Sequence, residues 1–141
     1  SFAYGPGRFP RELYPLYRAV FGCLEGNTSA SLPAGADQSL DFTYVKDIAR
    51  AVCLLYETPN LKYRQYNVCS GVYHRIPELS SKAAEIAGVT VNLSIGPGRI
   101  TPRGPSLDSS RLREELGFKA EYDFERGVRE YVEWLKFETS R

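Results

Sequence analysis

The residues best suited to bind a metal ion or to form disulfide bonds are few and widely separated. Three cysteines, Cys23, Cys53 and Cys69, are odd in number and share no spacing that is typical of metal ligands, and His74 is the only histidine. This pattern argues against a zinc site and against a disulfide framework. It favours a protein of the reducing cytoplasm that holds no metal.

A second group of residues that could bind a ligand lies where a predicted strand runs directly into a predicted helix. Residues 42–45 are β-formers, and a helical pattern starts directly after them. Such junctions often carry ligand contacts in α/β enzymes. Asp41 and Tyr44 could each hydrogen-bond a hydroxyl group of a ligand there, although Asp41 could equally serve the structure alone.

The helix that follows this junction is the strongest structural prediction in the chain. Apolar positions recur in it at i, i+1, i+4, i+5, i+7 and i+8, which makes one broad helical face. Asp47 precedes that face, and its carboxylate is predicted to cap the first turn, a contribution of roughly 1 kcal/mol. The residues predicted to face the core are Ile48, Ala49, Val52, Cys53, Leu55 and Tyr56.

The remaining pattern predicts an α/β fold of an α+β-like kind, a small lobe with short strands and about five helices. Residues 1–141 are expected to form a single domain, whose elements are separated by turn-forming glycines and prolines. In order, the predicted elements are a strand at 1–4, a helix from Glu12 or Pro15 to Cys23, a loop at 26–39 with at most a short strand, a strand at 65–68, a helix at 77–87 that stops at Gly88, a strand at 89–95, a loop at 96–106, and two helices capped by Asp108 and Asp123.

The composition is that of a soluble globular protein. Hydrophobic residues make up 43% of the 141 residues, and no apolar run approaches the roughly 20 residues of a membrane span. Lysine and arginine number 18 against 17 aspartates and glutamates, and the basic residues are scattered. Neither binding to nucleic acid nor binding to a membrane is indicated.

Four motifs follow one another along nearly the whole chain. They are Tyr4-Gly5-Pro6-Gly7; the aromatic strand leading into Asp47-Ile48-Ala49-Arg50-Ala51; Tyr66-Asn67-Val68-Cys69-Ser70-Gly71; and Asp108-Ser109-Ser110-Arg111 through Glu115-Leu116-Gly117-Phe118 with a closing helix from Gly127 to Trp134. In this order they resemble the C-terminal half of the extended short-chain dehydrogenase/reductases. This is the NAD-dependent epimerase/dehydratase family, which acts mostly on nucleotide sugars.

The resemblance implies where a substrate would be contacted. By position, the substrate-facing residues of the family correspond to Tyr4, Gln38, Leu40 and Arg103. An arginine suits such a role because its guanidinium can hold a phosphate or a carboxylate with two parallel hydrogen bonds, the alternative being a solvated loop arginine. Many family members have Arg in place of Leu40 and Asn in place of Phe2, so a smaller sugar acid or another polyol also fits.

The resemblance implies NAD or NADP as the cofactor of the whole enzyme, yet the chain itself has no credible site for either. Gly5-x-Gly7 follows a predicted strand, but the third glycine of the dinucleotide-binding turn and the acidic residue about 20 positions further on are missing. The Tyr-x-x-x-Lys pair of the family is missing too, since Tyr14 and Tyr17 lack the lysine. No cofactor-binding and no catalytic residue is therefore predicted.

Two functions follow from these observations. In the first, the chain is the substrate-binding portion of an NAD(P)-dependent sugar or nucleotide-sugar epimerase, dehydratase or dehydrogenase, a fragment or truncated product that is inactive without its dinucleotide-binding (Rossmann) half. An apolar surface near Phe2, Tyr4 and the helix that follows them is then expected, where the missing half docks or where the chain self-associates. In the alternative, the chain is a stand-alone truncated α/β protein that binds a small polyol or a partner protein.

Overall fold

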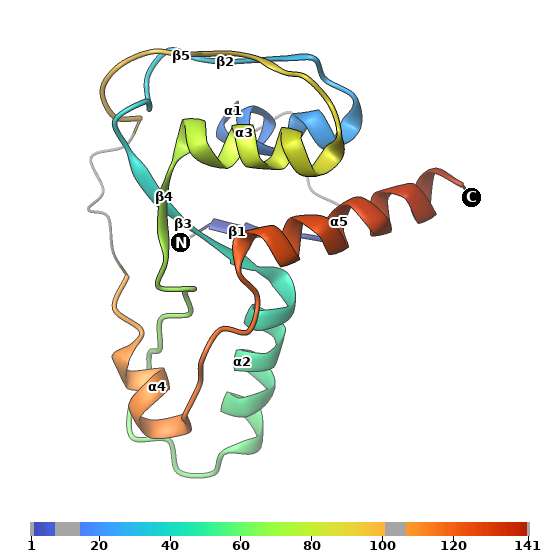
Figure 1. Cartoon of the computed structure of the whole chain (residues 1–141). Helices are drawn as coiled ribbons and strands as arrows, with labels where there is room; N and C mark the ends of the chain where they lie inside the picture. The colour runs from blue at the N-terminus through green and yellow to red at the C-terminus, as the bar shows by residue number, and fades with distance from the viewer. Residues whose placement is uncertain (1, 8–14, 101–106, 141) are drawn as a thin grey trace.

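The computed structural model of the chain describes residues 2–7, 15–100 and 107–140 (Figure 1). Short strands and five α-helices make up the described part, which confirms the predicted α/β class. In chain order the elements are β1 (Phe2–Tyr4), α1 (Pro15–Phe21), the 3-10 helix η2 (Gly22–Glu25), β2 (Ser29–Leu32), β3 (Ser39–Tyr44), α2 (Val45–Glu57), β4 (Tyr73–Arg75), α3 (Ile76–Ala87), β5 (Asn92–Ile95), α4 (Ser110–Leu116) and α5 (Phe124–Thr139).

The described strands form two small sheets. In the three-stranded sheet, β3 lies between β1 and β4, with β1 parallel and β4 antiparallel to it. In the other sheet, β2 and β5 run parallel. Because β3, α2, β4 and α3 lie between β2 and β5 in the sequence, this second sheet joins segments that are far apart along the chain.

Most of the core lies between the two sheets. Figure 1 shows the β2–β5 pair on one side of α1 and α3, and the three-stranded sheet with α5 on the other side. Phe21 lies at the centre of this core, with its ring centroid 5.1 Å from that of Tyr4 and 4.8 Å from that of Tyr17. The Tyr17 and Tyr131 hydroxyls hydrogen-bond each other at 2.9 Å, which joins α1 to α5.

Of the two residues near which an apolar surface is expected, Tyr4 is buried and Phe2 is half-buried. Tyr4 is 2% exposed, its hydroxyl donates to the Phe124 carbonyl oxygen at 3.2 Å, and burial raises its pKa. Phe2 stacks on Phe42, with ring centroids 5.4 Å apart. The described chain buries Tyr4 in its core and packs the half-buried Phe2 against that core.

Helix α2 begins earlier than the sequence predicts. The side of the helix that faces the body of the protein also differs from the predicted one. Its first residue is Val45, so Asp47 lies inside the first turn and is not the cap. Asp47 is 1% exposed and Ala51 is fully buried. Four of the residues predicted to be buried are exposed: Ala49, Val52, Cys53 and Tyr56.

The burial of Asp47 depends on hydrogen bonds from a distant segment. Its Oδ1 accepts the backbone N–H of Glu121 and its Oδ2 that of Tyr122, each at 3.0 Å. Arg50 donates to Oδ1 at 2.9 Å. A buried carboxylate requires such partners, and these partners turn the Asp47 side of α2 toward the body of the protein.

A smaller apolar cluster lies between α2 and α4, at the lower end of Figure 1. Residues 65–68, predicted to form a strand, pack against it through Tyr66 and Val68 and are not a strand. No described strand lies beside this segment to accept its backbone hydrogen bonds, so its β-forming residues are partly buried without a sheet. The strand found nearby is β4. The buried members of the cluster are Ala51, Leu112 and Phe118.

The predicted cap of the last helix is confirmed, and that of the preceding helix is displaced by one residue. Asp123 is the N-cap of α5 and accepts a backbone N–H of the first turn at 2.7 Å. The N-cap of α4 is Ser109, and Asp108, one residue earlier, accepts the N–H of Ser110 at 2.8 Å. Gly88 follows α3 with a φ of 70°, the left-handed conformation in which glycine commonly ends helices.

Three further properties bear on function. No helix in the described ranges combines the length and the apolar character that crossing a membrane requires. The three cysteines are free, with Cys53 exposed and Cys23 and Cys69 buried. Among the described residues, no three of the His, Cys, Asp or Glu side chains are grouped so as to hold a metal ion.

Candidate functional site

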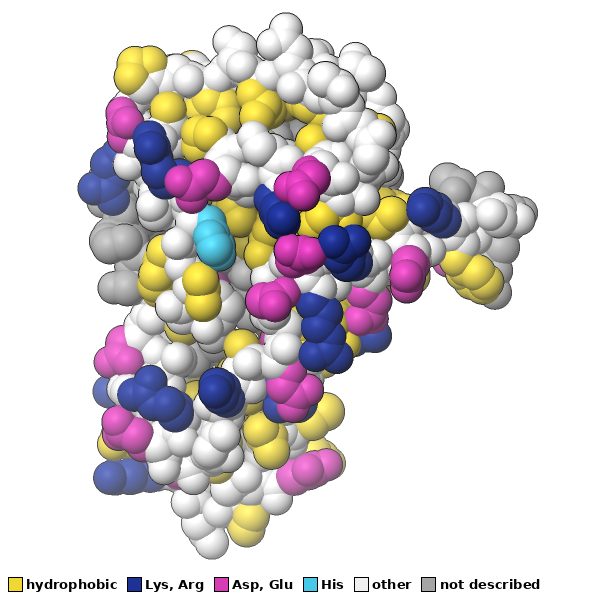
Figure 2. All heavy atoms as spheres, viewed as in Figure 1, with side chains coloured by type: hydrophobic (Ala, Val, Ile, Leu, Met, Phe, Trp, Pro, Cys, Tyr) yellow, Lys and Arg dark blue, Asp and Glu magenta, His cyan; other side chains and the backbone are white. Residues whose placement is uncertain are grey.

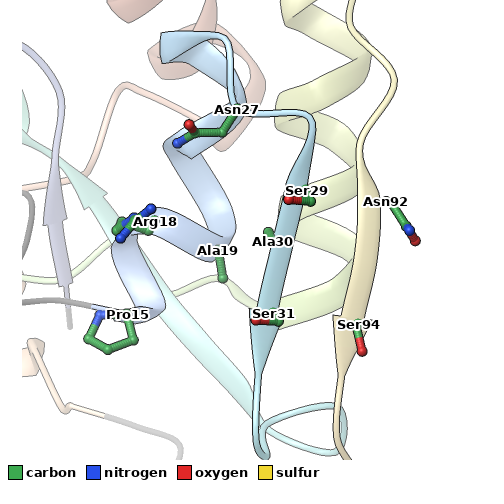
Figure 3. A pocket seen from close by; sticks show the side chains of 9 residues that line it. All are labelled: Pro15, Arg18, Ala19, Asn27, Ser29, Ala30, Ser31, Asn92 and Ser94. Atoms are coloured by element: carbon green, nitrogen blue, oxygen red, sulfur yellow. The ribbon is translucent and has the colours of Figure 1, made fainter.

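A pocket of about 350 Å³ lies between α1 and the β2–β5 pair (Figure 3). This volume is near the lower end of the range for ligand pockets, roughly 300 to 1,000 Å³. Most of the lining side chains are polar. The lining residues are Pro15, Arg18 and Ala19 from α1, Asn27 from the connection between η2 and β2, Ser29, Ala30 and Ser31 from β2, and Asn92 and Ser94 from β5.

The polar wall of the pocket follows from the alternation of side chains along the strands. In β2, Ser29 and Ser31 are exposed, whereas Leu32 is buried in the core at 5% exposure. The register places Ser29 opposite Asn92 and Ser31 opposite Ser94. The two strands therefore hold four small polar side chains in adjacent positions.

The backbone of β2 adds further donors and acceptors. Figure 3 shows β2 between β5 and α1. Hydrogen bonds at both ends of β2 identify the residues that bond toward β5: the N–H of Asn92 donates to the Thr28 oxygen, and the N–H of Gly96 donates to the Leu32 oxygen, both at 2.9 Å. Alternation along the strand then directs the backbone groups of Ser29 and Ser31 to the opposite edge, toward α1 and the pocket.

Arg18 supplies the charge of the described lining. It is exposed and lies in the last turn of α1. With the residues that the structure describes it forms no salt bridge, so its guanidinium is available to an anion. A guanidinium binds phosphate or carboxylate with charge-assisted, often bidentate hydrogen bonds.

Two loops, residues 33–38 and 96–100, join at the C-terminal ends of β2 and β5 to form a clasp. A side chain at Gly96 would lie 2.1 Å from the Pro33 carbonyl oxygen, so this close approach requires glycine. The clasp fixes the path of the chain as far as Ile100. Its hydrogen bonds run from the N–H of Gly35 to the Gly98 oxygen at 3.1 Å, from the N–H of Ala36 to the Gly96 oxygen at 3.0 Å, from the N–H of Gly98 to Asp37 Oδ2 at 2.7 Å and from the N–H of Ile100 to Gln38 Oε1 at 2.9 Å.

The four residues predicted to contact substrate are placed as follows. Arg103 lies outside the described residues. Tyr4, Gln38 and Leu40 are 2%, 3% and 7% exposed, and none of them lines the pocket beside α1. Gln38 holds the clasp through Ile100, and the other two belong to the core. A role of these residues in substrate binding stays a prediction.

Of the two polar residues at the strand–helix junction, Asp41 serves the structure. It is 3% exposed, and its Oδ2 accepts the N–H of Gly71 at 2.7 Å and the hydroxyl of Ser70 at 2.9 Å. These bonds tie β3 to the turn before β4. Tyr44 is buried against Tyr122, with ring centroids 4.5 Å apart, and burial raises the pKa of its hydroxyl.

The residues of the pocket were not among those predicted to be functional. The alternation in Ser29-Ala30-Ser31-Leu32 is the available signal for β2, but four residues are too few to establish a period. Arg18 gave no signal in the sequence, because its position beside β2 is a consequence of tertiary packing.

The fold matches solved structures of nicotinamide-cofactor proteins. WbmF from Bordetella bronchiseptica, solved in complex with NAD+, has a TM-score of 0.75 at 27% identity, and the match covers 99% of this chain and 44% of that one. MoeE5, solved with UDP-glucose and NAD, has a TM-score of 0.77 at 26% identity, covering 98% and 46%. RMD from Pseudomonas aeruginosa, solved with NADPH, has a TM-score of 0.77 at 24% identity, covering 97% and 46%, which shows the fold alone.

The sequence comparisons agree with the fold. Residues 1–69 match the NAD dependent epimerase/dehydratase family. The dTDP-glucose 4,6-dehydratase of Salmonella typhimurium is 30% identical, with 93% of this chain and 38% of that protein covered. A probable dTDP-glucose 4,6-dehydratase of Sinorhizobium fredii is also 30% identical, and the chain spans 39% of its length. The resemblance to the NAD-dependent epimerase/dehydratase family is thereby confirmed.

Proposed function

We propose that this chain is the substrate-binding portion of an NAD(P)-dependent nucleotide-sugar epimerase, dehydratase or dehydrogenase. The observation that carries the proposal is the polar pocket that Arg18 shares with the open edge of β2. By itself the chain binds the nucleotide part of the substrate and performs no turnover.

The edge of β2 fits a pyrimidine base. Uracil and thymine present an imide edge that alternates carbonyl acceptors with one N–H donor. The backbone N–H and C=O groups of Ser29 and Ser31 offer the complementary pattern. Solved neighbours support this ligand class, since MoeE5 was solved with UDP-glucose and WbmF with NAD+ and UDP.

Arg18 and the clasp fit the rest of such a ligand. A diphosphate attached to the nucleoside brings negative charge, and the Arg18 guanidinium lies in the same pocket as β2. Arg103, which follows the clasp by three positions in the sequence, is a second arginine for which anion binding is predicted. The relatives named as dTDP-glucose 4,6-dehydratases are consistent with a diphosphate-linked sugar.

Titration by NMR and calorimetry tests the proposal. UDP and UDP-glucose should bind, ADP should bind at least tenfold more weakly because adenine lacks the imide edge, and free glucose should not bind. Amide shifts should concentrate at Ser29–Ser31. Equal responses to UDP, ADP and glucose would contradict the proposal and favour a general polyol-binding module.

Arginine variants provide a matched comparison. Arg18→Ala should weaken UDP binding by about tenfold or more, since a charged hydrogen bond contributes roughly 1.5 to 3 kcal/mol. The same variant should leave uridine binding unchanged. Arg129→Ala is the control, because Arg129 pairs with Glu125 on the surface of α5 at 2.6 Å and lies outside the pocket. Equal losses of UDP affinity in both variants would show that the net charge of the protein, and not a binding site at Arg18, determines the affinity.

A further inference from the structure

Asn27 lines the pocket beside α1 with an amide that the protein itself does not use. It lies in the connection between η2 and β2, is exposed, and shares the pocket lining with Arg18. Figure 3 shows its side chain on the α1 side of the pocket, opposite β2. With the residues that the structure describes, the side-chain amide forms no hydrogen bond. Its N–H donors and its carbonyl acceptor are therefore available to a ligand.

The position of this amide depends on Gly22. The backbone N–H of Asn27 donates to the Gly22 carbonyl oxygen at 3.1 Å. A side-chain carbon at position 22 would lie 2.8 Å from Asn27 Nδ2, and the nearest atoms outside the local backbone all belong to the Asn27 side chain. Glycine at this position therefore leaves the space that the amide occupies.

The chemistry of a pyrimidine nucleotide directs its ribose toward the Asn27 side of the pocket. In the proposed function, the imide edge of the base bonds to the backbone of β2. The ring nitrogen N1, which carries the ribose, lies on the far side of the ring from the imide edge. The ribose is therefore directed away from β2 and toward α1, the side on which Arg18 and Asn27 lie.

The two hydroxyls of a ribose match the two ends of an amide. Arg18 is proposed to hold the diphosphate, which leaves Asn27 for the sugar. The 2′- and 3′-hydroxyls are neighbours that each donate and accept, and the amide presents Oδ1 and Nδ2 side by side. One amide can thus bond both hydroxyls. A deoxyribose has only the 3′-hydroxyl and leaves one of the two amide groups without a partner.

We infer, resting on the function proposed for this pocket, that Asn27 binds the ribose hydroxyls and makes the site selective for uridine nucleotides over deoxyribonucleotides. A site that bonds a hydroxyl of its ligand discriminates against the analogue that lacks this hydroxyl. Because Asn27 is exposed, water replaces the lost bond in part. The preference is therefore about fivefold, the effect of one neutral hydrogen bond.

Calorimetry with UDP and dUDP tests this role of Asn27. The chain should bind UDP about fivefold more tightly than dUDP, and Asn27→Ala should reduce this ratio to about one. Asn67→Ala is the matched control, because Asn67 is also exposed but does not line the pocket, and it should keep the ratio. Equal affinities for UDP and dUDP, or an unchanged ratio in Asn27→Ala, would overturn the role of Asn27 and leave the proposed function standing. No binding of UDP would contradict the proposed function itself, and the role of Asn27 with it.

The choice of ligands removes the contribution of surface charge. On the face drawn in Figure 2, basic and acidic side chains are interspersed. Whatever attraction they exert on a diphosphate is the same for both ligands, since UDP and dUDP carry the same charge. The ratio of the two affinities therefore reports on the 2′-hydroxyl alone.

Gly22→Ala tests the geometry without removing the amide. The added methyl group meets the flexible end of the Asn27 side chain, so the fold should be kept and the amide displaced. The ratio of UDP to dUDP affinity should fall as in Asn27→Ala, and the double variant should show no further fall. An unchanged ratio in Gly22→Ala would contradict the positioning by Gly22. In the unmodified chain, UDP should shift the NMR signal of the Asn27 side-chain amide more than dUDP does, and equal shifts would overturn the proposal.

Discussion

The carboxylate of Asp47 and the backbone of Tyr122, 75 positions apart in the sequence, are joined by a hydrogen bond of 3.0 Å. A matching bond of 3.0 Å joins the other carboxylate oxygen to the N–H of Glu121. Through these two bonds, the first turn of α2 holds the segment that leads into α5. The smaller apolar cluster between α2 and α4 and the main core are thereby connected at one buried carboxylate.

Asp47→Asn should destabilise the fold by about 2 kcal/mol. The amide has one oxygen in place of two, so one of the two backbone N–H groups loses its acceptor while buried, which typically costs roughly 1 to 3 kcal/mol. Urea unfolding, followed by far-UV circular dichroism, measures the change. Glu57→Gln, an exposed change on the same helix, should stay within about 0.5 kcal/mol. A similar result for Asp47→Asn would show that the two bonds do not stabilise the fold.

The N-caps of α4 and α5 give a paired prediction. Asp123→Ala removes the oxygen that accepts a first-turn N–H at 2.7 Å and should cost roughly 1 kcal/mol. Ser109→Ala removes a side chain that makes no capping hydrogen bond and should cost less than about 0.5 kcal/mol. Thermal and urea unfolding of both variants measure the difference. If the two substitutions cost the same, the bond to Asp123 is not the source of stability.

Acid sensitivity should depend on Glu115. The Tyr66 hydroxyl and the Lys62 N–H, both at 2.6 Å, hold the pKa of this carboxylate below its usual range. Since the folded pKa is lower than the unfolded value of about 4.3, the stabilising contribution is present above that pH and is lost as the pH falls through the folded pKa. Glu115→Gln should make stability less dependent on pH between about 5 and 3.

The Glu115 pKa itself can be followed by carboxyl carbon NMR. Tyr66→Phe removes the largest cause of the lowered pKa and should raise it toward the ordinary value. Tyr56→Phe serves as the control, because Tyr56 is 91% exposed and lies on the outer side of α2. An unchanged Glu115 pKa in Tyr66→Phe would assign the shift to the Lys62 N–H alone.

Local sequence signals predicted where the helices lie and some of their ends, because these depend on residues close together in the chain. Asp123 caps α5 and Gly88 ends α3 as predicted. The buried side of α2 was mispredicted, since periodicity assigned a carboxylate to the polar face. Nothing near Asp47 in the sequence reveals that its carboxylate would be buried and hydrogen-bonded by the backbone N–H groups of residues 121 and 122.

The prediction of a strand at 65–68 is wrong for a related reason. Tyr66 and Val68 have the β-forming character of a strand, but a strand also needs a neighbour that accepts its backbone hydrogen bonds. The described chain provides none there, and the side chains pack against the smaller cluster instead. The pocket was missed in the same way, because Arg18 and Ser31 meet only after β2 has paired with β5.

The chain should not bind a nicotinamide cofactor measurably. The third glycine of the phosphate-binding turn and the acidic ribose partner are absent from the sequence. Calorimetry with NADH and NADPH should therefore show no saturable heat, while UDP-glucose binds in the same preparation. A dissociation constant below roughly 100 µM, about 5.5 kcal/mol of binding, would contradict this expectation and require a site formed by other residues.

Arg103 is predicted to contact the anionic part of the substrate. It follows the clasp by three residues, and the clasp is fixed by the bond of 2.9 Å between the N–H of Ile100 and Gln38. Ligands with a phosphate or carboxylate should therefore bind better than their neutral sugars. Arg103→Ala should remove that preference and leave the fold intact, because a loop arginine contributes little to a core.

The charge and the geometry of Arg103 can be separated. Arg103→Lys should restore the preference only in part, since an ammonium supplies charge without the planar fork that holds two oxygens. NMR titrations with a uridine diphosphate sugar, a sugar acid and a neutral hexose measure the preference, and the Gln38 amide reports on the clasp. Equal perturbations by all three ligands would show that this arginine is solvated and that the chain has no preference for an anionic ligand.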